Sequence, residues 1–129
     1  MEKRKRLELL LGLVLGIVVI LVIGELFLIR YHTATIDYTL RDGEYLSRSW
    51  SGYMVGFRVS ITSTGDYMNV RIIVDGIPVY SVDYVYTVSY EYRMSFGQHT
   101  VELIIENPPW ILGLGPPIMV TGQITIQRW

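Results

Sequence analysis

The sequence predicts an all-β domain, an antiparallel immunoglobulin-like sandwich of about seven to eight strands, preceded by one apolar helix. Residues 7–29 are almost continuously apolar, whereas the rest of the chain consists of short runs in which apolar and polar residues alternate. Turn residues recur about every ten positions in this second part. Alternation with a period of two is typical of strands that bury one face.

The apolar segment, residues 7–29, is long enough to cross a membrane, because a helix of this length extends ~34 Å against a hydrocarbon layer of ~30 Å. Four basic residues precede it and only Arg30 follows it. The excess of positive charge predicts a cytoplasmic segment 1–6, a linker 30–34 and an extracytoplasmic domain 35–129. A cleaved secretory signal is the alternative, but its apolar part is usually only ~7–15 residues long.

Several residues of this segment are candidates for packing against other helices. Gly12 and Gly16 form a GxxxG pair, and Glu8 and Gly24 continue the same four-residue spacing along one side of the helix. The alternative is that glycine is simply common in transmembrane helices. Glu25 reaches the membrane surface or faces a packed assembly, because a carboxylate in lipid is costly.

The strands expected after the helix are separated by recognisable turns. Residues 53–62 alternate most clearly, with Tyr53 and Phe57 on the inward face. Asp75-Gly76 predicts a two-residue hairpin turn, and residues 96–98 predict another turn. The expected strands are residues 35–40, 44–50, 53–62, 67–74, 77–82, 87–94, 99–106 and 118–128.

Three segments, Val59–Gly65, Val70–Val79 and Gly97–Leu103, together resemble CARDB-type immunoglobulin-like modules. In those modules one strand ends in a Thr-Gly turn, another ends in a VDG hairpin, and a G-x-H-x-V segment opens a late strand. The resemblance implies an extracellular adhesion or spacer module without catalytic residues. His99 would then have a structural role.

The layout of one amino-terminal helix and an outer β-domain is similar to that of archaeal surface-filament proteins, both pilin-like subunits and accessory proteins of the motility filament. Glu8 corresponds loosely to the glutamate near the start of the pilin helix. The chain departs from the pilin pattern because Leu7 directly follows Arg6, where pilins have a small residue.

Composition argues against several classes of function. The chain has no cysteine, which excludes thiol chemistry and disulfides. From Tyr31 onward six Arg stand against nine Asp and Glu, so nucleic acid is not an expected partner. His32 and His99 have no neighbours at metal-ligand spacing. We therefore expect no metal, no cofactor and no catalytic residues.

Tyrosines form the first candidate contact surface. Tyr84, Tyr86, Tyr90 and Tyr92 share one parity with Tyr80 and could form an exposed aromatic face that binds sugars or a protein. The alternative is that the alternation breaks near Thr87 and the rings cover the core.

The second candidate is the connection at residues 107–117, whose four prolines prevent regular strand pairing. Trp110, Ile111, Leu112 and Leu114 make this loop unusually apolar. It either folds back to close one end of the domain or forms an exposed tip for a partner or a membrane surface.

These features favour a non-enzymatic, membrane-anchored surface module that mediates protein–protein interaction or anchors an assembly. Protein partners or a homo-oligomer are expected. One alternative is a structural subunit of a pilus-like filament or of a viral or cell envelope, assembled through its helix. A second alternative is an accessory subunit of a membrane enzyme complex.

Overall fold

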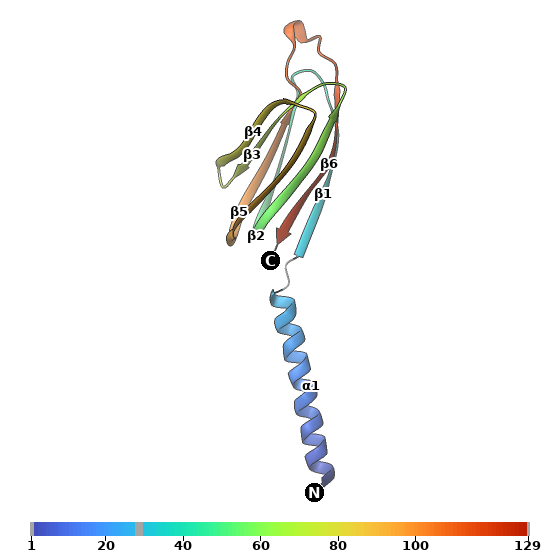
Figure 1. Cartoon of the computed structure of the whole chain (residues 1–129), viewed down its shortest axis with the longest axis vertical. Helices are drawn as coiled ribbons and strands as arrows, with labels where there is room; N and C mark the ends of the chain where they lie inside the picture. The colour runs from blue at the N-terminus through green and yellow to red at the C-terminus, as the bar shows by residue number, and fades with distance from the viewer. Residues whose placement is uncertain (1, 28–29, 129) are drawn as a thin grey trace. The chain divides into compact units, whose positions relative to one another are not determined.

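A computed structural model describes the backbone of residues 2–27 and 30–128, and the side chains of residues 2–21 and 31–128. The chain forms two compact units that divide between Ile29 and Arg30. The first is a helix and the second is a β-sheet domain (Figure 1).

Helix α1 comprises Glu2–Phe27. Near its start Arg4 and Glu8 are one turn apart and form an ion pair at 3.7 Å. Among the described residues, no helix combines the length and apolar character needed to cross a membrane. The predicted span at residues 7–29 includes residues 22–29, whose side chains lie outside the described part.

The second unit is one antiparallel sheet of six strands in the order β1-β6-β2-β5-β3-β4. The sheet confirms the prediction of an antiparallel all-β domain. Its strands are β1 (Arg30–Leu40), β2 (Tyr45–Thr64), β3 (Met68–Val74), β4 (Ile77–Val85), β5 (Thr87–Glu106) and β6 (Ile118–Arg128).

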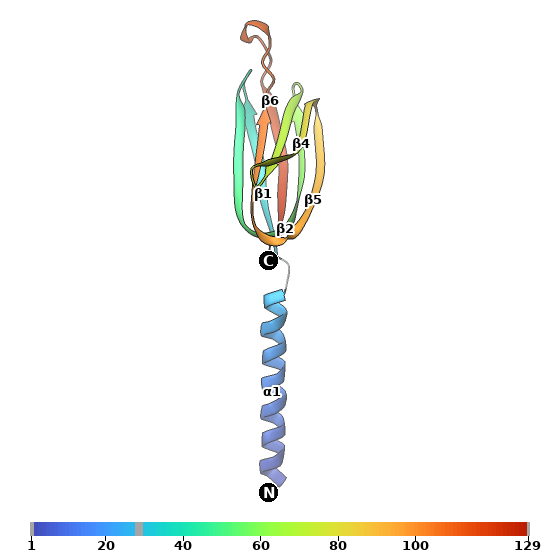
Figure 2. The ribbon, with the colours of Figure 1, turned by 90° about the vertical axis from the view of Figure 1, so that its left-hand side faces the viewer.

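The strand count differs from the expected seven to eight because β2 and β5 each join two predicted strands. Both are 20 residues long and pair with each other along most of their length. The predicted turn at residues 96–98 is therefore an irregularity inside β5, opposite a register shift between Met54 and Gly56 of β2. Figure 2 shows the long strands bending sharply, so that the sheet curves around its core.

Because of this bend, the two ends of the long strands have different neighbours. The second part of β2 pairs with β6 as well as β5, while the second part of β5 pairs with β3. The hydrogen bonds therefore join all six strands in one continuous sheet, in place of the two separate sheets expected of a sandwich.

The register shift in β2 also corrects the predicted inward face of this strand. Tyr53 was expected to point inward with Phe57, but Tyr53 is 57% exposed while Met54 and Phe57 are buried. An extra residue in one strand of a pair reverses the side-chain alternation beyond it. The alternation therefore runs in one phase before Val55 and in the other phase after Gly56.

In β3 and β6 the period of two holds along the whole strand. The predicted inward residues of β3 are all buried, and Asp75 and Gly76 form the expected hairpin turn with φ of 52° and 78°. Strand β1 begins at Arg30, so the predicted linker at residues 30–34 is paired with β6. The core is one apolar cluster of Ile36, Leu40, Met54, Phe57, Val59, Ile61, Met68, Val70, Ile72, Val74, Val88, Val101, Leu103, Ile105, Ile118, Val120, Ile124 and Ile126.

Candidate functional site

The strongest candidate site lies at the end of the sheet where the β5–β6 loop, residues 107–117, projects beyond the neighbouring loops (Figures 1 and 2). We refer to its four large apolar side chains, Trp110, Ile111, Leu112 and Leu114, as the apolar tip. The β1–β2 and β2–β3 connections contact its base.

Asn107 fixes the start of this loop. Its side chain is buried and donates hydrogen bonds to the carbonyl oxygens of Leu40 at 3.1 Å and Pro116 at 3.0 Å. Its backbone N–H donates to Glu44, and its carbonyl accepts from the N–H of Gly43. Asn107 thereby ties the start of the loop to the end of β1 and the β1–β2 turn, and it also binds the far end of the loop at Pro116. Its loss would be costly because buried polar groups would be left without partners.

Two aspartates hold Trp110. The Asp42 carboxylate accepts the Trp110 backbone N–H at 2.8 Å, and Asp66 accepts the indole N–H at 3.2 Å. Gly115 is packed tightly beside them, since a Cβ there would lie 2.3 Å from Asp42 Oδ1 and 2.9 Å from the indole ring. These hydrogen bonds and this close packing brace the loop at Trp110 and Gly115.

The apex itself is a short 3₁₀ turn, Ile111–Gly113, closed by a hydrogen bond from Gly113 N–H to the Trp110 carbonyl. Ile111 is 88% exposed, Leu112 86% and Leu114 74%. Of the two alternatives for this loop, the structure thus shows an exposed tip and not a plug. Leu112 has φ of 64°, a left-handed conformation that is costly for a residue with a Cβ.

The tyrosines do not form one continuous face. Tyr90 and Tyr92 are half-buried against Phe57, with ring centroids 6.3 and 5.7 Å from it. Tyr84 and Tyr86 are exposed. The alternative in which rings cover the core therefore describes Tyr90 and Tyr92.

Tyr86 belongs instead with the loops near the apolar tip. Its ring centroid lies 4.2 Å from that of Tyr67, which directly follows Asp66 in the chain. The parity of the sequence groups Tyr86 with Tyr90, but Tyr86 lies in the connection between β4, which ends at Val85, and β5, which begins at Thr87.

The helix candidates remain separate from this site. Glu8, Gly12 and Gly16 are exposed, and an added Cβ at either glycine would meet nothing within 4 Å. Gly24 and Glu25 fall among the residues whose side chains are not described. Helix packing at these positions stays a prediction.

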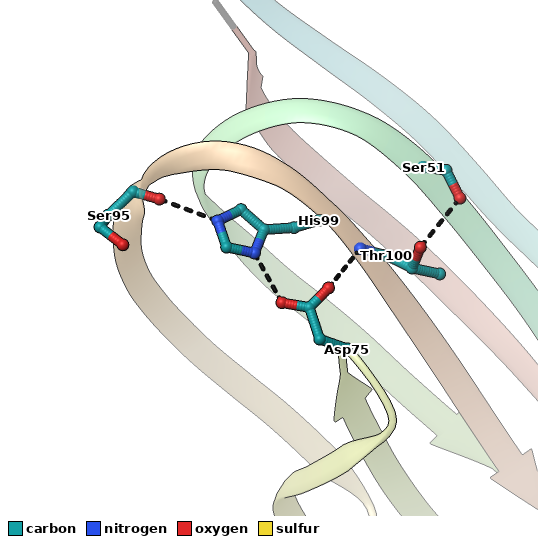
Figure 3. A network of polar contacts seen from close by, with 5 residues as sticks. All are labelled: Ser51, Asp75, Ser95, His99 and Thr100. Carbon is teal, nitrogen blue, oxygen red and sulfur yellow. Dashed lines mark hydrogen bonds and ion pairs between the residues drawn. The ribbon is translucent and has the colours of Figure 1, made fainter.

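A second polar cluster surrounds His99, at the bend of β5 (Figure 3). His99 Nδ1 lies 2.6 Å from Asp75 Oδ2, and Nε2 lies 2.8 Å from the carbonyl oxygen of Ser95. Asp75 also accepts the backbone N–H of Thr100 at 2.9 Å. The cluster joins the β3–β4 turn to β5.

His99 and Asp75 each favour the charged form of the other. The hydrogen bond to Asp75, followed by that to Ser95, raises the pKa of His99. The same bond from His99, followed by that from Thr100, lowers the pKa of Asp75. Because a carbonyl and not a hydroxyl faces Nε2, the His–Asp pair does not activate Ser95 as a nucleophile.

Among the side chains that the structure describes, no group of three or more His, Asp or Glu residues is placed to hold a metal ion. The residues that sequence reasoning missed are Asn107, Asp42 and Asp66, which brace the loop. Asn107 stands at the start of the apolar loop, which is a weak signal in the sequence. Asp42 and Asp66 lie in other connections, and no local pattern links them to Trp110.

No family model matches the chain, and no curated protein matches it. Several solved structures are similar to part of the chain at a low level. A family two carbohydrate esterase from Cellvibrio japonicus is 16% identical with a TM-score of 0.47, over 78% of this chain and 35% of the esterase. The chain therefore spans about a third of the length of that enzyme.

Two smaller proteins are similar at the same level. The CBM36-1 domain of a multidomain xylanase from the hindgut metagenome of Trinervitermes trinervoides is 16% identical with a TM-score of 0.36, over 74% of this chain and 96% of the domain. A family 35 carbohydrate binding module from an environmental isolate is 14% identical with a TM-score of 0.40, over 72% of each chain. Similarity this low does not indicate a function for the chain, and it tests neither of the resemblances noted in the sequence.

Proposed function

We propose that the chain is a non-enzymatic interaction module, anchored in a membrane by residues 7–29, whose extracytoplasmic β-domain makes its contact through the apolar tip. The exposure of the apolar tip carries this proposal. Large apolar side chains on a soluble domain usually pack inward, and an exposed cluster of them is typical of an interaction site.

The bracing of the loop supports a binding role. A loop with no purpose beyond connecting β5 to β6 would be expected to be polar and mobile. Here three polar residues, Asn107, Asp42 and Asp66, hold an apolar apex in one conformation. A preorganised apex loses little conformational entropy when it binds.

The wider layout is also part of the proposal. The bent sheet would serve as the two layers of an immunoglobulin-like sandwich, as in the CARDB-type and archaeal surface proteins that the sequence resembles. Self-association through Gly12 and Gly16 would provide a second contact, since that side of the helix leaves room for another backbone.

Site-specific photocrosslinking tests the contact. A benzophenone amino acid at Leu112 should crosslink to another molecule in membranes of cells that produce the chain, because benzophenone reacts with C–H bonds of either protein or lipid. The matched control places the same group at Gln98, an exposed residue in β5 beside the bend. Equal crosslinking at Leu112 and Gln98 would contradict the proposal.

A further inference from the structure

The residue types of the apolar tip indicate the kind of partner that it contacts, which its exposure alone does not. Between Asn107 and Pro117 the sequence contains no charged residue. Its most exposed side chains, those of Ile111, Leu112 and Leu114, are aliphatic and project from a narrow apex. Such an apex offers a partner neither charge nor a broad flat surface.

Several positions of this loop need no hydrogen-bond partner from the solvent. Four prolines, at positions 108, 109, 116 and 117, have no N–H to satisfy. The backbone N–H groups of Trp110 and Gly113 and the indole N–H of Trp110 are all bonded within the protein. This matters most in hydrocarbon, where water cannot satisfy an exposed backbone group and each one costs several kcal/mol.

Aromatic and acidic side chains lie next to the apex. The Asp42 carboxylate is close to the apex turn, since a Cβ at Gly113 would lie 3.6 Å from its Oδ2, and Tyr67 and Tyr86 lie exposed beside Asp66. Within the loop itself Trp110 is the residue type that favours a membrane interface, where an indole has an apolar body and a polar N–H.

We propose that the apolar tip inserts into a lipid bilayer, with Ile111, Leu112 and Leu114 among the acyl chains and Trp110 at the interface. Within the β-domain, Arg30 and the base of this loop lie at opposite ends of β1, since Arg30 pairs with Arg128 and Leu40 pairs with Ile118. Eleven strand residues extend roughly 33 Å. The contact is therefore made at the end of the β-domain opposite to Arg30. Insertion names the occupant of the contact that the proposed function assigns to the apolar tip, and so it rests on that function.

Brominated lipids test insertion directly, because bromine on the acyl chains quenches tryptophan within contact. Full-length protein is reconstituted in phosphatidylcholine vesicles, with tail-brominated phosphatidylcholine placed either in these vesicles or in added protein-free vesicles. We expect the fluorescence to fall in at least one of the two arrangements, which shows which bilayer receives the tip. Trp110→Ser identifies the quenched tryptophan, and it should remove most of the fluorescence change.

Two variants change exposed residues of the apex and leave the buried core unaltered. Ile111→Asp combined with Leu112→Asp should weaken this quenching at least about tenfold, because each removes an apolar side chain from lipid. Leu112→Gly should also weaken it, while glycine relieves the left-handed φ and so leaves the fold intact. Ile77→Asp is the control, an exposed apolar residue at the β3–β4 turn.

Each outcome separates the two proposals. Quenching that is unchanged by the apex variants, or vesicle binding that needs anionic lipid and ignores them, overturns insertion. Absence of quenching together with crosslinks from Leu112 to a protein overturns insertion and leaves the proposed function standing with a protein partner. Absence of both contradicts the two proposals together.

Discussion

At the scale of single residues, His99 shows how one side chain can join two elements of the sheet. Both of its ring nitrogens face acceptors, Asp75 on one side and the Ser95 carbonyl on the other. A neutral imidazole carries one N–H and can donate only one of these bonds. The protonated ring therefore fits this site better than the neutral ring does.

The stability of the domain should consequently depend on pH through this pair. The pKa of His99 is raised above its ordinary value of 6.5, so its contribution is complete below pH 6.5 and is lost as the pH rises through the folded-state pKa. The pKa of Asp75 is lowered below 3.8, so its contribution is present above pH 3.8 and is lost as the pH falls through the folded-state pKa. The pair should stabilise the fold most between about pH 4 and 6.5.

Urea unfolding between pH 5 and 9 measures this effect. The unfolding midpoint of the full chain in detergent should decline above pH 6.5, modestly because the pair is partly exposed, and His99→Gln should flatten the decline. His32→Gln, which changes the other histidine, serves as the control. Parallel pH profiles for the wild type and His99→Gln would show that the cluster does not contribute.

At the scale of elements, the packing of β6 beside β2 depends on a glycine. Gly122 pairs with Ile61, and a Cβ at Gly122 would lie 2.1 Å from the Ser60 carbonyl oxygen and 2.7 Å from Ile61 Cα. No side chain can occupy that space unless the two strands separate. The sequence shows this glycine in the middle of a predicted strand, where it usually marks a bulge or a close approach of another backbone.

Gly122→Ala should therefore destabilise the domain substantially. Gly52→Ala is a close control, because both glycines have φ of 149° but nothing lies within 4 Å of a Cβ at Gly52. The difference between the two variants isolates crowding from backbone strain, and we expect it to be about 1–3 kcal/mol in the free energy of unfolding. Equal losses for both variants in denaturant titrations would mean that only backbone strain matters.

At the scale of the whole molecule, the two compact units should fold independently. The core residues that the structure describes all lie between Ile36 and Ile126, so none of the described side chains of α1 belongs to that cluster. Deletion of residues 1–29 should leave the thermal midpoint of the β-domain unchanged, as measured by circular dichroism against the full chain in the same detergent. A midpoint lower by more than about 4–8 °C would correspond to ~1 kcal/mol of stabilisation by the helix.

The sequence by itself determined the class of the fold and much of its detail. The alternation in β3 identifies Met68, Val70, Ile72 and Val74 as core, and Asp75-Gly76 identifies the hairpin after them. These features are local, because a strand buries every second residue and a type I′ turn requires positive φ at adjacent positions. The apolar character of residues 107–117 could be recognised in the same way.

Only the tertiary structure decided how those elements combine. The turn expected at residues 96–98 became a bend within β5, and Tyr53 turned outward, because pairing with β2 fixed the register of both strands. The hydrogen bonds that brace the apolar tip join residues far apart in the sequence. Trp110 is 44 positions from Asp66 and 68 positions from Asp42. Whether an apolar loop closes a core or projects from it depends on such distant partners, which no periodicity along the chain reveals.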